Sequence, residues 1–294
     1  MQQYHLERAL VKDVLNLVSL PAAYFKIRDL VNCPESSIDQ IALVVISDPG
    51  LAAQVLKTAN SAFFGYRQKV ETVSRAINIM GTSRLCDLVL AAAAMATFSK
   101  IPCELVNMTQ FWRRSIYCGV LSRLLAERCK IFDNERLFVA GLLADIGHLV
   151  IYLKLPQQAI QAMELAQREQ LPICQSERQL MGLDYAAVGA ELMNIWSLPD
   201  CIETTTRFQN NPELANEFKL EASIIHIASR LASCIHEERP CNTQVSQFIL
   251  SLDDFPLQMT GLSVDRLTES AEDSHQYIAE TLRLLAPKPG NGAG

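Results

Sequence analysis

The chain lacks the short motifs that usually mark a catalytic or nucleotide-binding site. Its 294 residues hold no Gly-x-Ser-x-Gly elbow, no glycine-rich loop ending in Gly-Lys-Ser/Thr and no Gly-x-Gly-x-x-Gly. The nine cysteines form no Cys-x-x-Cys pair and no zinc-like cluster, and their odd, scattered number suits a reducing compartment. These absences argue against the common hydrolase, P-loop and dinucleotide-binding classes.

An excess of positive charge is also missing. The sequence has 26 lysines and arginines against 32 acidic residues, and its basic residues form no stripe. Duplex nucleic acid requires a concentrated cationic surface, because neutralisation of phosphates dominates its affinity for proteins. We therefore expect no nucleic-acid duplex among the partners.

Long apolar runs are absent as well. The longest weakly polar stretch, residues 88–98, is too short to cross a bilayer and is rich in alanine, which is typical of a buried helix. Residues 1–8 do not combine a basic region with a following apolar run, so they do not resemble a secretory signal. We expect a cytoplasmic protein without a membrane partner.

Period-two alternation, the mark of a half-buried strand, is not convincing anywhere, whereas apolar residues recur every three or four positions. Helix-capping residues punctuate the pattern at Asp48-Pro49, Thr72 and Asp184. The apolar run 42–46 also fits a buried helix better than a strand. We predict an all-α fold with helices over residues 2–18, 49–60, 72–81, 82–99, 184–196, 244–252 and 263–285.

Several short motifs occur in a fixed order along the chain. The most informative are Asp48-Pro49-Gly50-Leu51, Asn60-Ser61-Ala62, Gly141-Leu142-Leu143-Ala144-Asp145-Ile146-Gly147-His148-Leu149, and Trp196-Ser197-Leu198-Pro199. Taken jointly, these motifs resemble the HDOD family, the HD-related output domain of bacterial signalling proteins, from about residue 17 to about residue 234. The resemblance implies an N-terminal helical lobe (1–100) packed on an HD-like helical bundle (101–238). Beyond these, we expect C-terminal helices (239–286) and a disordered tail (287–294).

The same resemblance implies where a related metal-dependent HD phosphohydrolase would hold its ions. The first histidine of that pattern falls on Arg114, the His-Asp pair on Ala144-Asp145 and the late aspartate on Ser229. Two further places where histidines are common hold Tyr185 and Gln209-Asn210. A guanidinium cannot ligate a metal, and one carboxylate is too few donors to replace the hydration shell of a divalent ion. We therefore expect no catalytic residue, no metal and no cofactor, with Asp145 as a vestige of the ligand set.

Each surviving polar residue has a structural interpretation. We expect Asp145 to form an ion pair with Arg114, His148 to share a helical face with Asp145, and His226 to lie at a core edge with its ring hydrogen-bonded. If the former reaction cavity binds a small molecule, its candidate lining is Arg114, Asp145, His148, Tyr185 and His226. A second candidate, a contact between lobes, is formed by Asn60 and Ser61, where Asn60 is expected to end its helix by hydrogen bonding.

These observations favour a non-catalytic regulatory or interaction module in bacterial signal transduction, with a signalling protein of unknown identity as its partner. Two alternatives stay open. One is an active phosphohydrolase with a metal site remodelled around Asp145 and His148, and the other is a sensor that binds a nucleotide without cleaving it. The amount of apolar surface also permits a homo-oligomer.

Overall fold

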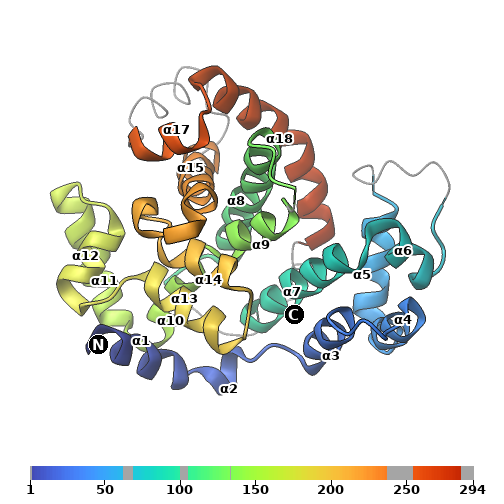
Figure 1. The fold of residues 1–294 in the computed structure, drawn as a ribbon. Coiled ribbons are helices and arrows are strands. Elements are labelled where there is room, and N and C mark those ends of the chain that lie inside the picture. Colours follow the sequence, from blue (N-terminus) through green and yellow to red (C-terminus); the bar gives the residue numbers. More distant parts are fainter. Residues whose placement is uncertain (1, 62–68, 100–104, 133, 237–253, 286–294) are drawn as a thin grey trace, which may run out of the picture. The chain divides into compact units, whose positions relative to one another are not determined.

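The computed structural model describes residues 2–61, 69–99, 105–132, 134–236 and 254–285. Within these residues every regular element is a helix, which confirms the predicted all-α fold. The chain divides into two compact units, which we describe separately (Figure 1). The bundle unit comprises residues 1–18 and 101–275, and the lobe unit comprises residues 19–100 and 276–294.

The bundle unit is organised around one long helix, α8 (Met108–Arg128), against which α9 (Glu135–Leu143) and α15 (Lys219–His236) pack. Residues 115–126 of α8 are buried on every side, which is the pattern of a helix at the centre of a core. A second layer forms where α13 (Tyr185–Ile195) packs against α10 (Ile146–Lys154) and α14 (Asp200–Arg207). The remaining elements of the unit are α1 (Gln2–Lys12), α2 (Leu15–Val18), α11 (Pro156–Glu169), α12 (Ile173–Met181), η2 (Pro212–Leu214), η3 (Asn216–Phe218), α17 (Asp254–Thr260) and the first part of α18 (Val264–Leu285).

Residues 1–18 belong with the bundle, which differs from the expected division at residue 100. The physical reason is burial: Val11, Val14 and Val18 are fully inaccessible to solvent, and α1 packs against α13. Trp196, from the tryptophan motif, donates its indole N–H to the carbonyl of Val18 at 3.0 Å. The predicted helix 2–18 is also interrupted, because α1 ends at Lys12 and α2 begins at Leu15.

The lobe unit contains α3 (Ala22–Val31), α4 (Ile38–Ile46), α5 (Pro49–Ala59), α6 (Val73–Met80), α7 (Thr82–Ser99) and the end of α18. The predicted caps are confirmed, since Asp48 accepts the N–H groups of Gly50 and Leu51, and Thr72 accepts that of Arg75. The apolar run 42–46 is helical, as predicted, and lies within α4. The predicted helix 263–285 corresponds to α18, whereas α17 was not predicted. The predicted helix 244–252 and the tail 287–294 lie outside the described residues.

One helical segment of the described chain, Glu135–Lys154, has the length and hydropathy of a membrane span, and 78% of its most apolar window is buried within the protein. The pair Val73–Met80 and Thr82–Ser99 passes the same test only jointly, and it is bent by 109°. Burial of this extent is what the core helices of a globular unit show.

The segment Glu135–Lys154 is not one helix. The expectation that His148 shares a helical face with Asp145 treated the motif from Gly141 to Leu149 as one helix, but α9 ends at Leu143 and α10 begins at Ile146. Two glycines let the helices on either side of the break pack closely against their neighbours. A Cβ on Gly141 would lie 2.8 Å from the carbonyl oxygen of Cys118, and one on Gly147 would lie 1.9 Å from that of Tyr185. The motif thus brings α9 onto α8 and α10 onto α13, and leaves Asp145 in the turn between them.

Candidate functional site

Arg114 joins three elements of the bundle unit. Its guanidinium forms an ion pair with Asp145 in the α9–α10 turn. It also donates to two hydroxyls of α15, from Nη2 to Ser233 Oγ at 2.9 Å and from Nη2 to Ser229 Oγ at 3.4 Å, while Nε lies 3.2 Å from Ser233 Oγ. The side chain therefore links α8, the turn and α15, and the predicted pairing of Arg114 with Asp145 is confirmed.

The carboxylate of Asp145 is almost fully enclosed, with 4% of the residue exposed, whereas the Arg114 side chain is 30% exposed. Its Oδ2 faces the guanidinium, and its Oδ1 accepts no hydrogen bond. A buried carboxylate requires a nearby positive charge, because the loss of hydration is otherwise not offset. Arg114 supplies that charge.

The positions that would hold a metal in a related HD enzyme do converge in space. Arg114 contacts both Asp145 and Ser229, so three of the four positions implied by the resemblance meet around one guanidinium. Among the described residues, no three His, Cys, Asp or Glu side chains gather closely enough to hold a metal ion. A divalent cation does not fit this set, since only one carboxylate is present and a permanent cation already lies against it.

His148 and Tyr185 form a stacked pair. Their ring centroids are 4.0 Å apart with an interplanar angle of 15°, and Nδ1 of His148 lies 3.2 Å from Oε1 of Glu177 without hydrogen-bond geometry. Glu177 is 1% exposed and accepts the backbone N–H of Tyr185 at 2.9 Å. His148 thus packs against the interior of the unit and makes no contact that would suit a metal ligand beside Asp145.

His226 on α15 is 5% exposed and hydrogen-bonded, as predicted. Its Nδ1 lies 2.7 Å from the carbonyl oxygen of Gln209, so Nδ1 must carry the proton. Its Nε2 then accepts from Nη1 of Arg230 at 3.4 Å. This network keeps the imidazole in one tautomer and places Arg230 beside it.

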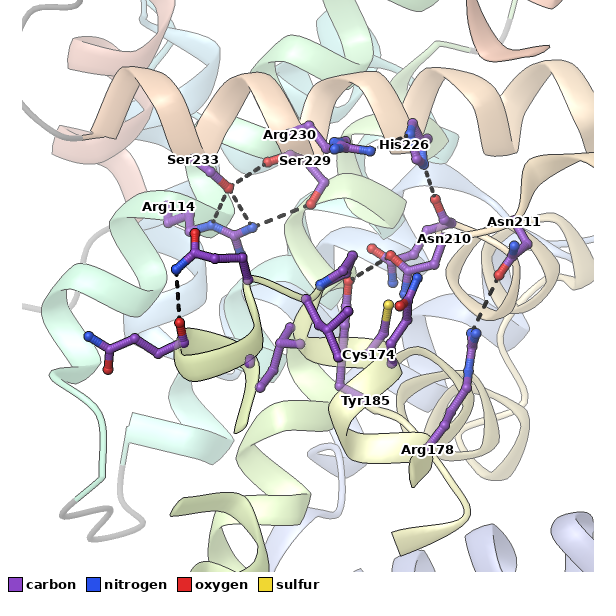
Figure 2. Close-up of a pocket in the computed structure, with 18 residues that line it drawn as sticks. Arg114, Cys174, Arg178, Tyr185, Asn210, Asn211, His226, Ser229, Arg230 and Ser233 are labelled. Atoms are coloured by element: carbon purple, nitrogen blue, oxygen red, sulfur yellow. Dashed lines mark hydrogen bonds between the residues drawn. The ribbon is translucent and has the colours of Figure 1, made fainter. Parts of the chain in front are cut away.

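A cavity of about 870 Å³ opens next to these residues in the bundle unit. Figure 2 shows Ser233, Ser229, Arg230 and His226 along α15 on one wall, with Cys174 and Arg178 of α12 on another. Of the five predicted lining residues, Arg114, Tyr185 and His226 line the cavity, whereas Asp145 and His148 do not. The full lining is Arg114, Ala166, Gln167, Gln170, Leu171, Pro172, Ile173, Cys174, Gln175, Arg178, Tyr185, Gln209, Asn210, Asn211, His226, Ser229, Arg230 and Ser233.

The lining contains two groups that could in principle react, and both are held in their protonated forms. Burial raises the pKa of the Tyr185 phenol, whose O–H donates to Oδ1 of Asn210 at 3.1 Å. Burial also raises the pKa of the Cys174 thiol, and the nearby carboxylates of Asp184 and Glu177 add to the effect. A neutral thiol is a poor nucleophile, so this wall of the cavity is suited to binding rather than to covalent chemistry.

No sequence motif pointed to one side of the cavity. The α11–α12 hairpin contributes its turn, where Gln170 adopts a left-handed conformation with φ of 54°. Arg178 and Arg230 also line the cavity and were not predicted. Their spacing along the chain carries no motif, and only packing brings the hairpin and α15 together.

The second predicted site lies in the lobe unit. Asn60 ends α5, as predicted, and its side chain pairs with the backbone of Val70, accepting the N–H at 2.7 Å and donating to the carbonyl at 2.8 Å. Ser61 Oγ is buried without a hydrogen-bond partner. Asn60 thus joins the end of α5 to Val70, and its role with Ser61 as a contact between lobes stays a prediction. Ala62 of this motif lies outside the described residues.

Comparison with known proteins supports the resemblance seen in the motifs. A family model of the HDOD domain matches residues 17–212. A solved structure from Shewanella amazonensis SB2B, provisionally named a phosphohydrolase, has 26% identity and a TM-score of 0.74, and the match covers 95% of this chain and 98% of that one. An HDOD domain protein of unknown function from Geobacter sulfurreducens has 20% identity and a TM-score of 0.72, with 94% and 96% covered.

Two further relatives are longer than this chain. A protein from Marinobacter aquaeolei VT8, provisionally named a signal transduction protein, has 21% identity and a TM-score of 0.69, and the match covers 96% of this chain and 65% of that one. An uncharacterized protein of Treponema pallidum (strain Nichols) is 23% identical over 252 residues, which is 85% of this chain and 48% of the relative. The chain therefore spans about half the length of this curated relative.

Proposed function

Because this chain belongs to the HDOD family, we propose that it is a non-catalytic regulatory module of bacterial signal transduction. The observation that supports the proposal is the contact of Arg114 with Asp145 and Ser229. The guanidinium lies where the ligand positions of an HD enzyme converge, and it balances the buried carboxylate as a metal ion would. Arg114 thus keeps the electrostatic cross-link of the fold without a Lewis acid that could activate water.

The main alternative is an active phosphohydrolase. The relative from Shewanella amazonensis, which is provisionally named a phosphohydrolase, is the observation in its favour. For this chain it would need Asp145 and His148 to hold a metal together. His148 instead stacks on Tyr185 beside the buried Glu177, and the nearest cation to Asp145 is Arg114. Both contacts would have to break before a metal could enter, which makes this alternative the weaker one.

The partner and location follow from the proposed role. We infer that the module acts in the cytoplasm through another signalling protein. The relative from Marinobacter aquaeolei, provisionally named a signal transduction protein, supports the signalling role. The longer relatives carry additional sequence beyond the matched region, and a partner domain attached to the same chain is one form that we propose for this interaction.

Turnover assays test the proposal directly. Purified protein with Mn²⁺ or Mg²⁺ is incubated with nucleotide and cyclic dinucleotide substrates, in parallel with Asp145→Ala. We expect no hydrolysis above the level of the variant, because Asp145 is the only family ligand that this chain retains. Metal-dependent turnover that Asp145→Ala abolishes, with the variant still folded by circular dichroism, would overturn the proposal.

A further inference from the structure

We propose that the cavity between the α11–α12 hairpin and α15 binds a phosphate ester of nucleotide size. The inference rests on the proposed non-catalytic function, because an active hydrolase would cleave such a ligand. It goes beyond that function by assigning a ligand class to a site in the bundle unit. Charge, unused hydrogen-bonding groups and size each contribute to the argument.

The charged residues of the lining are all arginines. Arg114, Arg178 and Arg230 line the cavity, and no aspartate or glutamate among the described residues does. This composition is opposite to that of the whole chain, which has a net charge of −6. A cavity that presents several guanidinium groups attracts an anion, and guanidinium is the side chain best suited to the oxygens of a phosphate.

Carboxylates do pair with two of these arginines, but from outside the cavity. Asp145 contacts Arg114, and Asp184 lies 2.5 Å from Nη2 of Arg178; both aspartates are buried and neither lines the cavity. They fix the position of each guanidinium, which also donates to other residues of the lining, Arg114 to Ser229 and Ser233 and Arg178 to Oδ1 of Asn211. Binding sites gain affinity when donors are held in place in this way before the ligand arrives.

Arg230 is held differently. It lies on α15, one turn after His226, and its Nη1 donates to the imidazole Nε2 at 3.4 Å. Ser229 and Ser233 on the same helix place hydroxyls beside it in the lining (Figure 2). A phosphate group has several oxygens that accept hydrogen bonds from separate directions, so it can use Arg230 together with the Ser229 hydroxyl, whereas the Ser233 hydroxyl already donates to the carbonyl of Ser229.

The cavity is larger than an inorganic anion requires. Its volume of about 870 Å³ is within the range for organic ligands. Six side-chain amides form much of the remaining wall, namely those of Gln167, Gln170, Gln175, Gln209, Asn210 and Asn211. Amides that both donate and accept suit the hydrogen-bonding edge of a planar ring such as a nucleobase.

Two of these amides have unused hydrogen-bonding atoms. Gln209 is 1% exposed and donates from Nε2 to the carbonyls of Ala144 and Thr206, which leaves Oε1 buried without a donor. Asn210 accepts from Tyr185 through Oδ1, while its Nδ2 is buried without an acceptor. Buried polar atoms in this state are costly and are normally satisfied by a partner. A nucleoside phosphate carries hydrogen-bond donors and acceptors as well as the anion, so it offers both kinds of partner to this wall of the cavity.

The test is a binding measurement with the full chain. Calorimetry and thermal shift are recorded with the four ribonucleoside 5′-monophosphates, with pyrophosphate and with the uncharged nucleosides. We expect at least one monophosphate to bind more tightly than pyrophosphate, and the nucleosides to bind at least tenfold more weakly. At a ligand concentration one hundred times its Kd, the free energy of unfolding should rise by about 2.7 kcal/mol.

Matched substitutions locate the site. Arg230→Gln and Arg178→Gln should each weaken binding at least tenfold. Removal of Arg178 leaves the buried Asp184 unpaired and can prevent folding, in which case Arg230→Gln alone tests the site. Arg168→Gln changes the net charge equally on α11, next to Gln167, but Arg168 does not line the cavity, so binding should be unchanged. Absence of binding by all phosphate probes at 10 mM, roughly the weak limit of specific binding, would overturn the inference, as would equal loss in Arg168→Gln.

The outcome also separates this inference from the proposed function. The nucleotide recovered after incubation with Mn²⁺ should be intact by chromatography. Binding with cleavage would overturn the non-catalytic function and keep the ligand class. Failure to bind, with no turnover, would overturn the ligand class and keep the non-catalytic function.

Discussion

Arg114 and Arg207 are both arginines within the bundle unit, yet their surroundings carry opposite charge balances. Arg114 faces one carboxylate, that of Asp145, and two hydroxyls. Arg207 is surrounded by three carboxylates, with Nε 2.7 Å from Glu203, Nη1 3.1 Å from Glu7 and Nη2 3.9 Å from Glu191. Arg207 is on α14 and links α1 to α13, whereas Arg114 is at the edge of a cavity.

The difference shows what each arginine contributes. At Arg207, carboxylates are in excess, so the loss of one still leaves the guanidinium paired. At Arg114 the charges are matched one to one, so the loss of Arg114 leaves the buried carboxylate of Asp145 without a positive charge. One guanidinium paired with one carboxylate is the charge balance that we expect if Arg114 has taken the place of a bound metal ion.

The largest expected effect is on stability when Arg114 is removed. Arg114→Ala leaves the buried Asp145 without a positive charge, which should lower the free energy of unfolding by about 3–5 kcal/mol. Arg128→Ala is the control on the same helix, because Arg128 pairs with the exposed Glu269 and Asp273 and should cost about 1 kcal/mol or less. Urea unfolding measures both. Equal losses in the two variants would mean that Arg114 has no special role.

A double-mutant cycle sharpens the same contrast. Arg114→Met combined with Asp145→Asn should recover much of the loss seen in the single variants, with a coupling energy of roughly 1–3 kcal/mol. The parallel cycle of Arg207→Met with Glu203→Gln should give a smaller coupling, because Glu7 stays beside Arg207. A larger coupling energy for Arg207 than for Arg114 would contradict the view that Arg114 depends more strongly on its single carboxylate.

The smallest effect concerns pH. Burial raises the pKa of the Glu7 carboxyl, and the contact with Arg207 offsets this only in part. An acid with a raised pKa binds its proton more tightly in the folded state, so its contribution to stability is lost as the pH rises from the unfolded value, 4.5, through the folded one. Glu7→Gln should therefore raise the free energy of unfolding at pH 7 by on the order of 1 kcal/mol, an advantage that disappears near pH 4. Thermal melts at the two pH values measure this difference.

The control for that experiment is Glu203→Gln, which changes a less buried carboxylate beside the same arginine. This variant should show no gain at pH 7. A Glu7→Gln protein that is less stable than the original at pH 7 would mean that the ion pair with Arg207 outweighs the cost of burying Glu7.

Much of the fold could be predicted because its signals are local. The caps at Asp48, Thr72 and Asp184 act on neighbouring backbone N–H groups, and all three occur as predicted. The break after Leu143 could not be predicted in the same way. It accompanies the close packing of Gly147 on the backbone of Tyr185, a contact between residues distant in the sequence.

The candidate site, like the fold, could be predicted only in part. Arg114 and Tyr185 were found because a family pattern fixes their positions, and His226 because it lies in the segment where that pattern expects the late aspartate. Arg178 and Arg230 belong to no pattern, and only the fold brings the hairpin near α15. Asp145 was named as part of the old ligand set and His148 because it follows Asp145 by three residues. Both are buried at the start of α10, and neither lines the cavity.

Metal binding by the protein and by a restored ligand set gives the most direct test of the central claim, that the Arg114 guanidinium replaces a metal ion. Mn²⁺ is titrated calorimetrically into the original chain and into the variant Arg114→His, Ala144→His, Ser229→Asp, with metal content measured after dialysis. The account predicts no stoichiometric metal in the original chain and about one or two ions in the folded variant, as HD-type sites hold with His and Asp ligands. Stoichiometric Mn²⁺ in the original chain, lost in Asp145→Ala, would contradict it.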